Sequence, residues 1–116
     1  MEIYISEDAT VATLQHEFQE AYSYLKLEFY RQPHAAGQPC PAKDKLLPGM
    51  PIEDVRMMHT FGWIDISRNR TAAAVEEDFS RLYGLNVQIM RKSGDLWLQT
   101  TTTDNRTLGQ MNEEGN

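Results

Sequence analysis

An internal repeat constrains the fold of this chain more than any other feature. Residues of the first half recur 61 positions later, and the matched set is Ile5-Ser6, Thr10, Leu14, Phe18 and Tyr22 against Ile66-Ser67, Thr71, Val75, Phe79 and Tyr83. After a shift of one residue the match continues, from the segment 25–31 to the segment 85–91. We interpret the two halves as copies of one supersecondary unit.

Each copy has the pattern strand, helix, strand. Apolar and polar residues alternate over 1–5 and 62–66, and again over 25–30 and 85–90, as in strands with one buried face. Between them, apolar residues recur at helical spacing, and Thr10 and Thr71 are placed to cap the two helices. Gly84 is placed to end the second helix in a left-handed conformation. The turn 93–95 leads into a fifth strand over 96–102.

Two successive β-α-β units predict an α+β fold of ferredoxin-like type. We expect a mostly antiparallel five-stranded sheet with two helices on one face. Residues 1–103 form the single predicted domain, since 116 residues suit one domain only. The proline- and glycine-rich stretch 32–60 is an irregular insert between the repeats, and 104–116 is a polar tail that we expect to fray.

The last quarter of the chain carries a distinctive stretch. Residues 91–100 read RKSGDLWLQT, followed by Thr103-Asp104, Thr107-Leu108 and 112–115 with the sequence NEEG. This region resembles a small family of uncharacterised bacterial proteins. The resemblance implies no activity, cofactor or catalytic residue.

Charge and composition limit the classes of partner. The chain has 17 acidic and 11 basic residues, a net charge of −6, which repels phosphate backbones and anionic lipid. No apolar run approaches the length of a membrane span, and the N-terminus has no signal-like pattern. The single cysteine fits a reducing compartment. We therefore expect a cytoplasmic protein that binds neither nucleic acid nor membrane.

The sheet face turned away from the helices is the main candidate surface. By strand alternation it carries both tryptophans and two tyrosines among polar residues, namely Tyr4, Tyr30, Trp63 and Trp97. Rigid aromatic rings among polar residues are typical of protein interfaces. The sequence thus predicts a non-enzymatic interaction or oligomerisation domain, in its most concrete form a homodimer through these four residues.

Two other interpretations of this face stay open. The apolar half of 32–60 could fold over it and make a second small core. The face could also stack bases, as in RNA-recognition modules, although the acidic balance and the lack of interleaved lysine and arginine argue against it.

A basic cluster is expected at the start of the second helix. Arg68 and Arg70 precede that helix, and Arg91 and Lys92 end the parallel strand that should finish beside them. Four cations near a first helical turn could hold an anion, although a solvated surface cluster is the simpler interpretation.

Catalytic and metal signals are weak. His34, Cys40 and His59 share the insert, but their spacing matches no standard zinc pattern. We expect no metal, cofactor or catalytic group. The alternative function is a small-ligand-binding or catalytic domain, with a pocket between the sheet and 32–60 and with these three residues as the first to examine.

Overall fold

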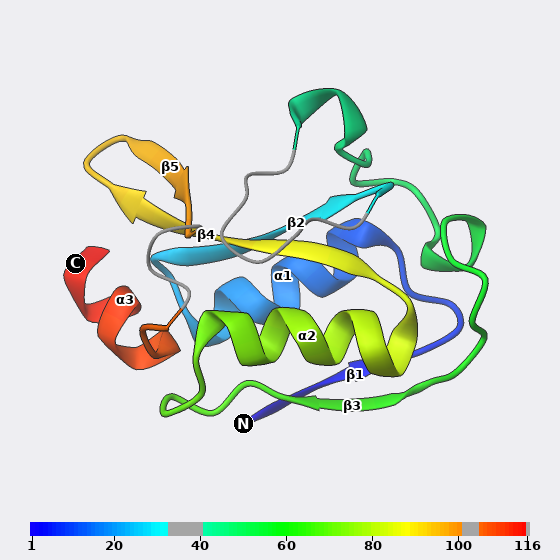
Figure 1. The fold of residues 1–116 in the computed structure, drawn as a ribbon, viewed down its shortest axis with the longest axis horizontal. Coiled ribbons are helices and arrows are strands. Elements are labelled where there is room, and N and C mark those ends of the chain that lie inside the picture. The colour runs from blue at the N-terminus through cyan, green and yellow to red at the C-terminus, as the bar shows by residue number, and fades with distance from the viewer. Residues whose placement is uncertain (33–40, 101–104, 116) are drawn as a thin grey trace.

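The structure is a computed structural model that describes residues 1–32, 41–100 and 105–115. It is an α+β fold with three helices and two antiparallel sheets (Figure 1). In chain order the elements are β1 (Glu2–Ile5), α1 (Val11–Ala21), β2 (Leu25–Tyr30), η1 (Ala42–Asp44), η2 (Ile52–Asp54), β3 (Gly62–Asp65), α2 (Ala72–Tyr83), β4 (Asn86–Ser93), β5 (Leu96–Gln99) and α3 (Leu108–Gly115).

The five strands do not form the single sheet that the sequence predicts. Among the residues that the structure describes, β1 pairs with β3 alone, in a two-stranded ribbon, while β2, β4 and β5 form a separate sheet in that order. The helices α1 and α2 lie between these two layers, each in contact with the strands of its own repeat (Figure 1). The predicted α+β class is therefore confirmed, whereas the prediction of a single five-stranded sheet is wrong.

The physical reason is that both β layers turn their apolar side chains toward the helices. Ile3 and Ile64 point inward from the ribbon, and Leu27 and Ile89 point inward from the three-stranded sheet, all essentially buried. Alternation along a strand specifies which face is apolar. It does not specify whether two such strands approach a helix from the same side or from opposite sides.

At the centre of each antiparallel pairing, a residue of the first repeat lies opposite the corresponding residue of the second repeat. Ile3 lies opposite Ile64 in the ribbon, and Glu28 lies opposite Gln88 in the sheet. The helix caps are also as predicted: the hydroxyls of Thr10 and Thr71 accept hydrogen bonds from first-turn amides. Gly84 ends α2 with φ of 65°. The two β-α-β units thus share both their element order and their local geometry.

A tyrosine near the end of α1 and another at the end of α2 each donate a hydrogen bond to a backbone carbonyl in β3 or just after it. Tyr22 Oη donates to the carbonyl of Ile66 at 2.5 Å, and Tyr83 Oη donates to the carbonyl of Trp63 at 2.8 Å. Burial raises the pKa of both phenols, so both remain protonated donors at neutral pH. These bonds fasten the ribbon to the helical layer.

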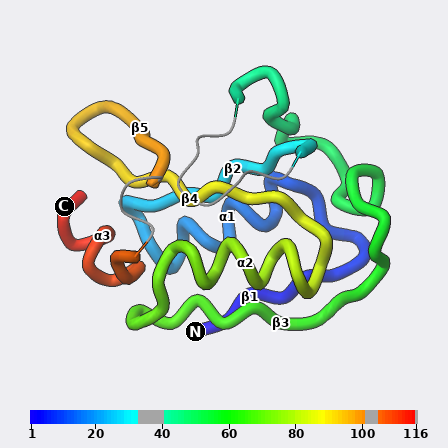
Figure 2. Tube along the Cα trace, viewed as in Figure 1, coloured from blue at the N-terminus to red at the C-terminus, as the bar shows by residue number. Residues whose placement is uncertain are grey.

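Residues 41–60 run from the end of β2 round the side of the molecule to β3 (Figure 2). Leu46 and Ile52 join the core, and the Met50 carbonyl accepts from the first amide of α1 at 3.0 Å. At the other helix, Arg56 and Thr60 donate to the last carbonyls of α2. As expected, the apolar half of the insert packs on the domain, but it does so at helix ends and leaves Leu47 and Met57 exposed.

The C-terminal residues form a helix where the sequence predicts a fraying tail. α3 buries Leu108 and Met111, and its first amide donates to the Arg70 carbonyl at 2.8 Å. Thr107 accepts a hydrogen bond from Gln110 N, which caps the helix. α3 therefore docks through apolar residues at helical spacing, a cap, and backbone hydrogen bonds to residues that precede α2.

A buried polar cluster joins α2 to the β4 edge beyond the end of β5. One carboxylate oxygen of Glu76 accepts from the Ile89 amide at 2.8 Å and from Gln88 Nε2 at 3.1 Å. Thr100 Oγ1 donates to the Ile89 carbonyl at 2.9 Å. Side chains thus satisfy the backbone groups of β4 where no strand pairs with them.

Candidate partner-binding surface

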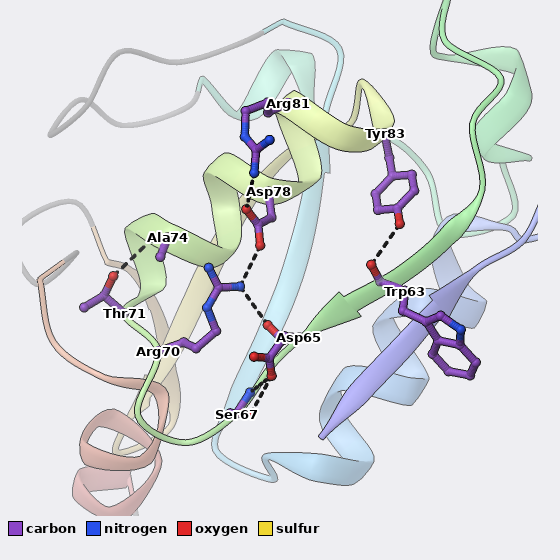
Figure 3. A network of polar contacts seen from close by, with 9 residues as sticks. All are labelled: Trp63, Asp65, Ser67, Arg70, Thr71, Ala74, Asp78, Arg81 and Tyr83. Atoms are coloured by element: carbon purple, nitrogen blue, oxygen red, sulfur yellow. Dashed lines mark hydrogen bonds and ion pairs between the residues drawn. The ribbon is translucent and has the colours of Figure 1, made fainter.

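The outer face of the β1–β3 ribbon carries the most exposed aromatic pair of the described chain. Tyr4 and Trp63 are directly opposed, with ring centroids 4.9 Å apart at an angle of 64°. Their exposed fractions are 38% and 58%. Figure 3 shows the Trp63 indole on the side of β3 away from Tyr83, so the ring is turned from the helical layer. The sequence placed both residues correctly on a face that no helix covers.

The same face carries two opposed carboxylates. Glu2 lies directly opposite Asp65, and both are exposed. Hydrogen bonds from the Ser67 hydroxyl and amide, with the Arg70 guanidinium nearby, lower the pKa of Asp65. Two ionised side chains directly opposite one another destabilise a strand pair. The opposition of these two carboxylates became visible only with the strand register. We call Glu2, Tyr4, Trp63 and Asp65 the ribbon outer face.

Two further apolar side chains close in sequence to Trp63 are exposed. Phe61, immediately before β3, is 62% exposed, and Met57 is 95% exposed.

A polar network fixes the outer edge of β3 (Figure 3). Tyr83 donates to the Trp63 carbonyl, and Arg70 donates to the Asp65 carbonyl at 2.9 Å. Arg70 is itself paired with Asp78 at 2.6 Å, which also pairs with Arg81. The backbone carbonyls along this edge are therefore satisfied within the protein.

The structure does not bring Tyr30 and Trp97 to the same surface. Tyr30 is buried in β2, and Trp97 lies half-buried on β5, in the opposite β layer. The Lys26 and Lys92 ammonium groups lie 5.0 and 5.7 Å from the Trp97 ring centroid, within cation–π range. The four predicted partner-binding residues thus reduce to one adjacent pair, Tyr4 and Trp63, because the strands belong to two sheets.

The four basic residues that were predicted to bind an anion do not converge on one site, and three of them contact different side chains. Arg68 pairs with Glu113 of α3 at 2.7 Å, Arg70 pairs with Asp78, and Lys92 lies against Trp97. Arg91 is half-buried, and its Nε has no hydrogen-bond partner within the described residues. The sequence did not anticipate the acidic side chain that α3 brings to Arg68.

Of the three insert residues considered for chemistry, only His59 is described; His34 and Cys40 lie outside the described residues. The exposed His59 ring donates a 2.6 Å hydrogen bond to the Glu53 carboxylate, which also pairs with Arg56. The Arg56 side chain is fully buried and donates to the Tyr83 carbonyl at 3.0 Å. Nothing in the sequence pattern marked Arg56 as a buried cation. Across the described residues, no group of three or more His, Cys, Asp or Glu side chains could hold a metal ion.

A shallow depression of about 560 Å³ lies between β2, α1 and the start of the insert. Glu28 is nearly buried in this depression and forms ion pairs with Lys26 at 3.1 Å and with Lys45 at 3.6 Å. The lining is completed by glutamine side chains of α1 and by residues of the insert: Gln15, Gln19, Ala42, Leu46, Leu47 and Pro48. The depression lies between β2 of the sheet and part of the 32–60 segment, and His59 does not line it.

Comparison with known proteins brought no match: no protein family, curated protein or solved structure is similar to this sequence at a significant level. Within the described ranges, no helix has the length and apolar character needed to cross a bilayer. The class that the fold and surface define is a small α+β protein with an exposed aromatic ribbon.

Proposed function

We propose that this protein is a non-enzymatic interaction module that binds another protein through the ribbon outer face. The observation that carries the proposal is the exposed Tyr4–Trp63 pair on a two-stranded layer. Aromatic residues supply a large share of the binding energy at protein interfaces, because they bury much area with few rotatable bonds. The acidic surface and the single cysteine favour a cytoplasmic location, which we include in the proposal.

The proposal is tested by capturing partners from extract on immobilised protein, with wild type, Trp63→Ser and Leu96→Ser compared. Leu96 is a matched control because it is 66% exposed on the other β layer. We expect at least one partner to be retained by wild type and Leu96→Ser and lost with Trp63→Ser. Equal loss with both variants, or no loss with either, would contradict binding through this face.

Self-association is measured on the same variants by light scattering after gel filtration. The charge of the ribbon outer face leads us to expect a monomer over the accessible concentration range, in contrast to the homodimer that the sequence favours. If a dimer forms and is abolished by Trp63→Ser but not by Leu96→Ser, the ribbon outer face is still the binding surface, and its partner is a second copy of this chain.

The internal duplication belongs to the same proposal. We infer that the two β-α-β units arose by duplication, supported by the repeat-related residues at the centre of both strand pairings. The first copy has Tyr4 where the second has Asp65, and Glu2 where the second has Trp63. Because these positions differ between the two copies, the ribbon, although its two strands are related by the repeat, carries one aromatic pair and one acidic pair on its outer face.

The depression beside β2 supports a second candidate function, the binding of a small polar ligand. Lys26 and Lys45 both lie at its lining, with Glu28 between them. A thermal-shift screen of small carboxylates and phosphates tests it, with Lys45→Ala expected to remove any stabilisation. A shift that Lys45→Ala leaves unchanged would place the ligand elsewhere.

A further inference from the structure

The two edges of the β1–β3 ribbon differ in their unpaired backbone groups. Ile66 N donates to the Met1 carbonyl, so the Met1–Ile66 and Ile3–Ile64 positions are hydrogen-bonded pairs. Because bonded and non-bonded pairs alternate along an antiparallel ladder, Glu2 and Tyr4 direct their backbone groups away from β3. Trp63 and Asp65 likewise direct theirs away from β1.

The outward carbonyls of the β3 edge are already occupied. Those of Trp63 and Asp65 accept hydrogen bonds from Tyr83 and Arg70. At the β1 edge, the N–H and C=O groups of Glu2 and Tyr4 have no hydrogen-bond partner among the described residues, and no described strand lies beside them. An exposed strand edge of this kind is a template for pairing with another chain.

We infer that β1 accepts an extended basic segment of a partner protein as an additional strand. This inference rests on the proposed function and names the partner class for that surface. Two residues of β1 offer two amide donors and two carbonyl acceptors to the backbone of the incoming segment, and the side chains of the segment give the specificity.

Charge complementarity identifies the side chains of the segment. Residues that alternate onto the ribbon outer face meet Glu2 and Asp65 at one end and the Tyr4 and Trp63 rings beside them. A lysine or arginine there relieves the repulsion between the opposed carboxylates and lies against aromatic rings in cation–π geometry. Intervening residues point to the same side as Ile3 and Ile5, which is the apolar side of the ribbon. The segment therefore alternates basic and apolar residues.

A second copy of this chain is a poorer occupant. Pairing β1 with β1 of another protomer would place Glu2 and Asp65 of both chains on one face, so the second copy would add two carboxylates to a face where Arg70 and the N-terminal ammonium are the cations near Asp65. Each protomer also carries a net charge of −6. The same charges oppose nucleic acid at this edge.

The test uses short synthetic peptides and the full-length Trp97→Phe protein, in which Trp63 is the only tryptophan and reports contact by fluorescence. The probes are a peptide alternating arginine with valine, its glutamate–valine counterpart, and the arginine peptide N-methylated at alternate residues. N-methylation keeps the charge and removes the donors that a strand ladder needs. We expect binding of the first peptide only, with a change in Trp63 emission.

Matched charge changes in the protein complete the test. Glu2→Lys should lower the affinity for the arginine peptide about tenfold or more, the equivalent of about 1.4 kcal/mol. Glu7 is an exposed acid beyond the ribbon, so Glu7→Lys should lower this affinity less than Glu2→Lys does. Equal binding of the N-methylated peptide would overturn strand addition, and equal binding of the glutamate peptide would overturn the basic partner. If no peptide binds but a partner from extract is still lost with Trp63→Ser, this inference fails while the proposed function stands.

Discussion

The hydroxyl of Tyr22, next to the end of α1, lies 2.5 Å from the carbonyl oxygen of Ile66, which follows β3. Both residues are essentially buried, so no water replaces this hydrogen bond if it is lost. The bond joins the first repeat to the second across 44 positions of the chain. The hydrogen bond from Tyr83 to the Trp63 carbonyl joins the end of α2 to the ribbon in the same way.

Replacing Tyr22 by Phe should lower the free energy of unfolding by about 1–2 kcal/mol, because the Ile66 carbonyl would remain buried without its donor. Urea denaturation followed by circular dichroism measures the effect. Tyr4→Phe is the matched control, since the Tyr4 side chain is exposed and has no hydrogen bond to a described residue. Equal stability of Tyr22→Phe and wild type would show that the Tyr22 bond contributes nothing.

Gly62 permits the close approach of Tyr83 to the ribbon. A Cβ at this position would meet Tyr83 Oη at 2.6 Å, and the residue has φ of 153°. Gly62→Ala should therefore cost about 1–3 kcal/mol and displace the Tyr83 hydroxyl from the Trp63 carbonyl. Gly49→Ala is the control, because nothing lies within 4 Å of its added Cβ. Thermal melting that ranks the two variants equally would contradict the steric role of Gly62.

Features that depend on residues close together in sequence were predictable. Thr10 and Thr71 cap their helices, and Gly84 ends α2, because each acts on amides or carbonyls within one turn. The apolar face of each strand was predictable for the same reason. The division into two sheets was not, since Ile3 and Leu27 are buried against helices whether their strands share a sheet or face one another.

The candidate surface shows the same limit. Tyr4 and Trp63 could be assigned to a helix-free face by alternation alone, and they lie side by side. Trp97 obeys the same alternation but belongs to the other layer, so no local pattern could separate it from Trp63. The burial of Arg56 depends on the Tyr83 carbonyl, 27 residues away, and had no sequence signal.

The buried carboxylate of Glu76 should be required for stability. Glu76→Ala would leave the Ile89 amide without its acceptor and Gln88 without one of its partners, at a cost of about 1–3 kcal/mol. Glu77→Ala, one residue along the same helix and exposed, should change stability by less than about 0.5 kcal/mol. Hydrogen exchange should also show faster exchange of the Ile89 amide in Glu76→Ala. An unchanged exchange rate there would contradict the assigned bond.

Glu53 should make stability depend on pH on the acid side of neutrality. Hydrogen bonds from His59 and from Arg56 lower the pKa of its carboxyl, so folding favours the ionised form. The stabilisation is then complete above the ordinary glutamate pKa of about 4.3 and is lost as the pH falls through the lower folded-state value. Glu53→Gln should accordingly be less stable than wild type at pH 7, with a difference that shrinks on acidification. Urea denaturation of both proteins across this pH range measures the difference in the free energy of unfolding, with Glu77→Gln as an exposed control. A difference that is constant with pH, or that grows below the ordinary pKa, would contradict the pairing of Glu53 with Arg56 and His59.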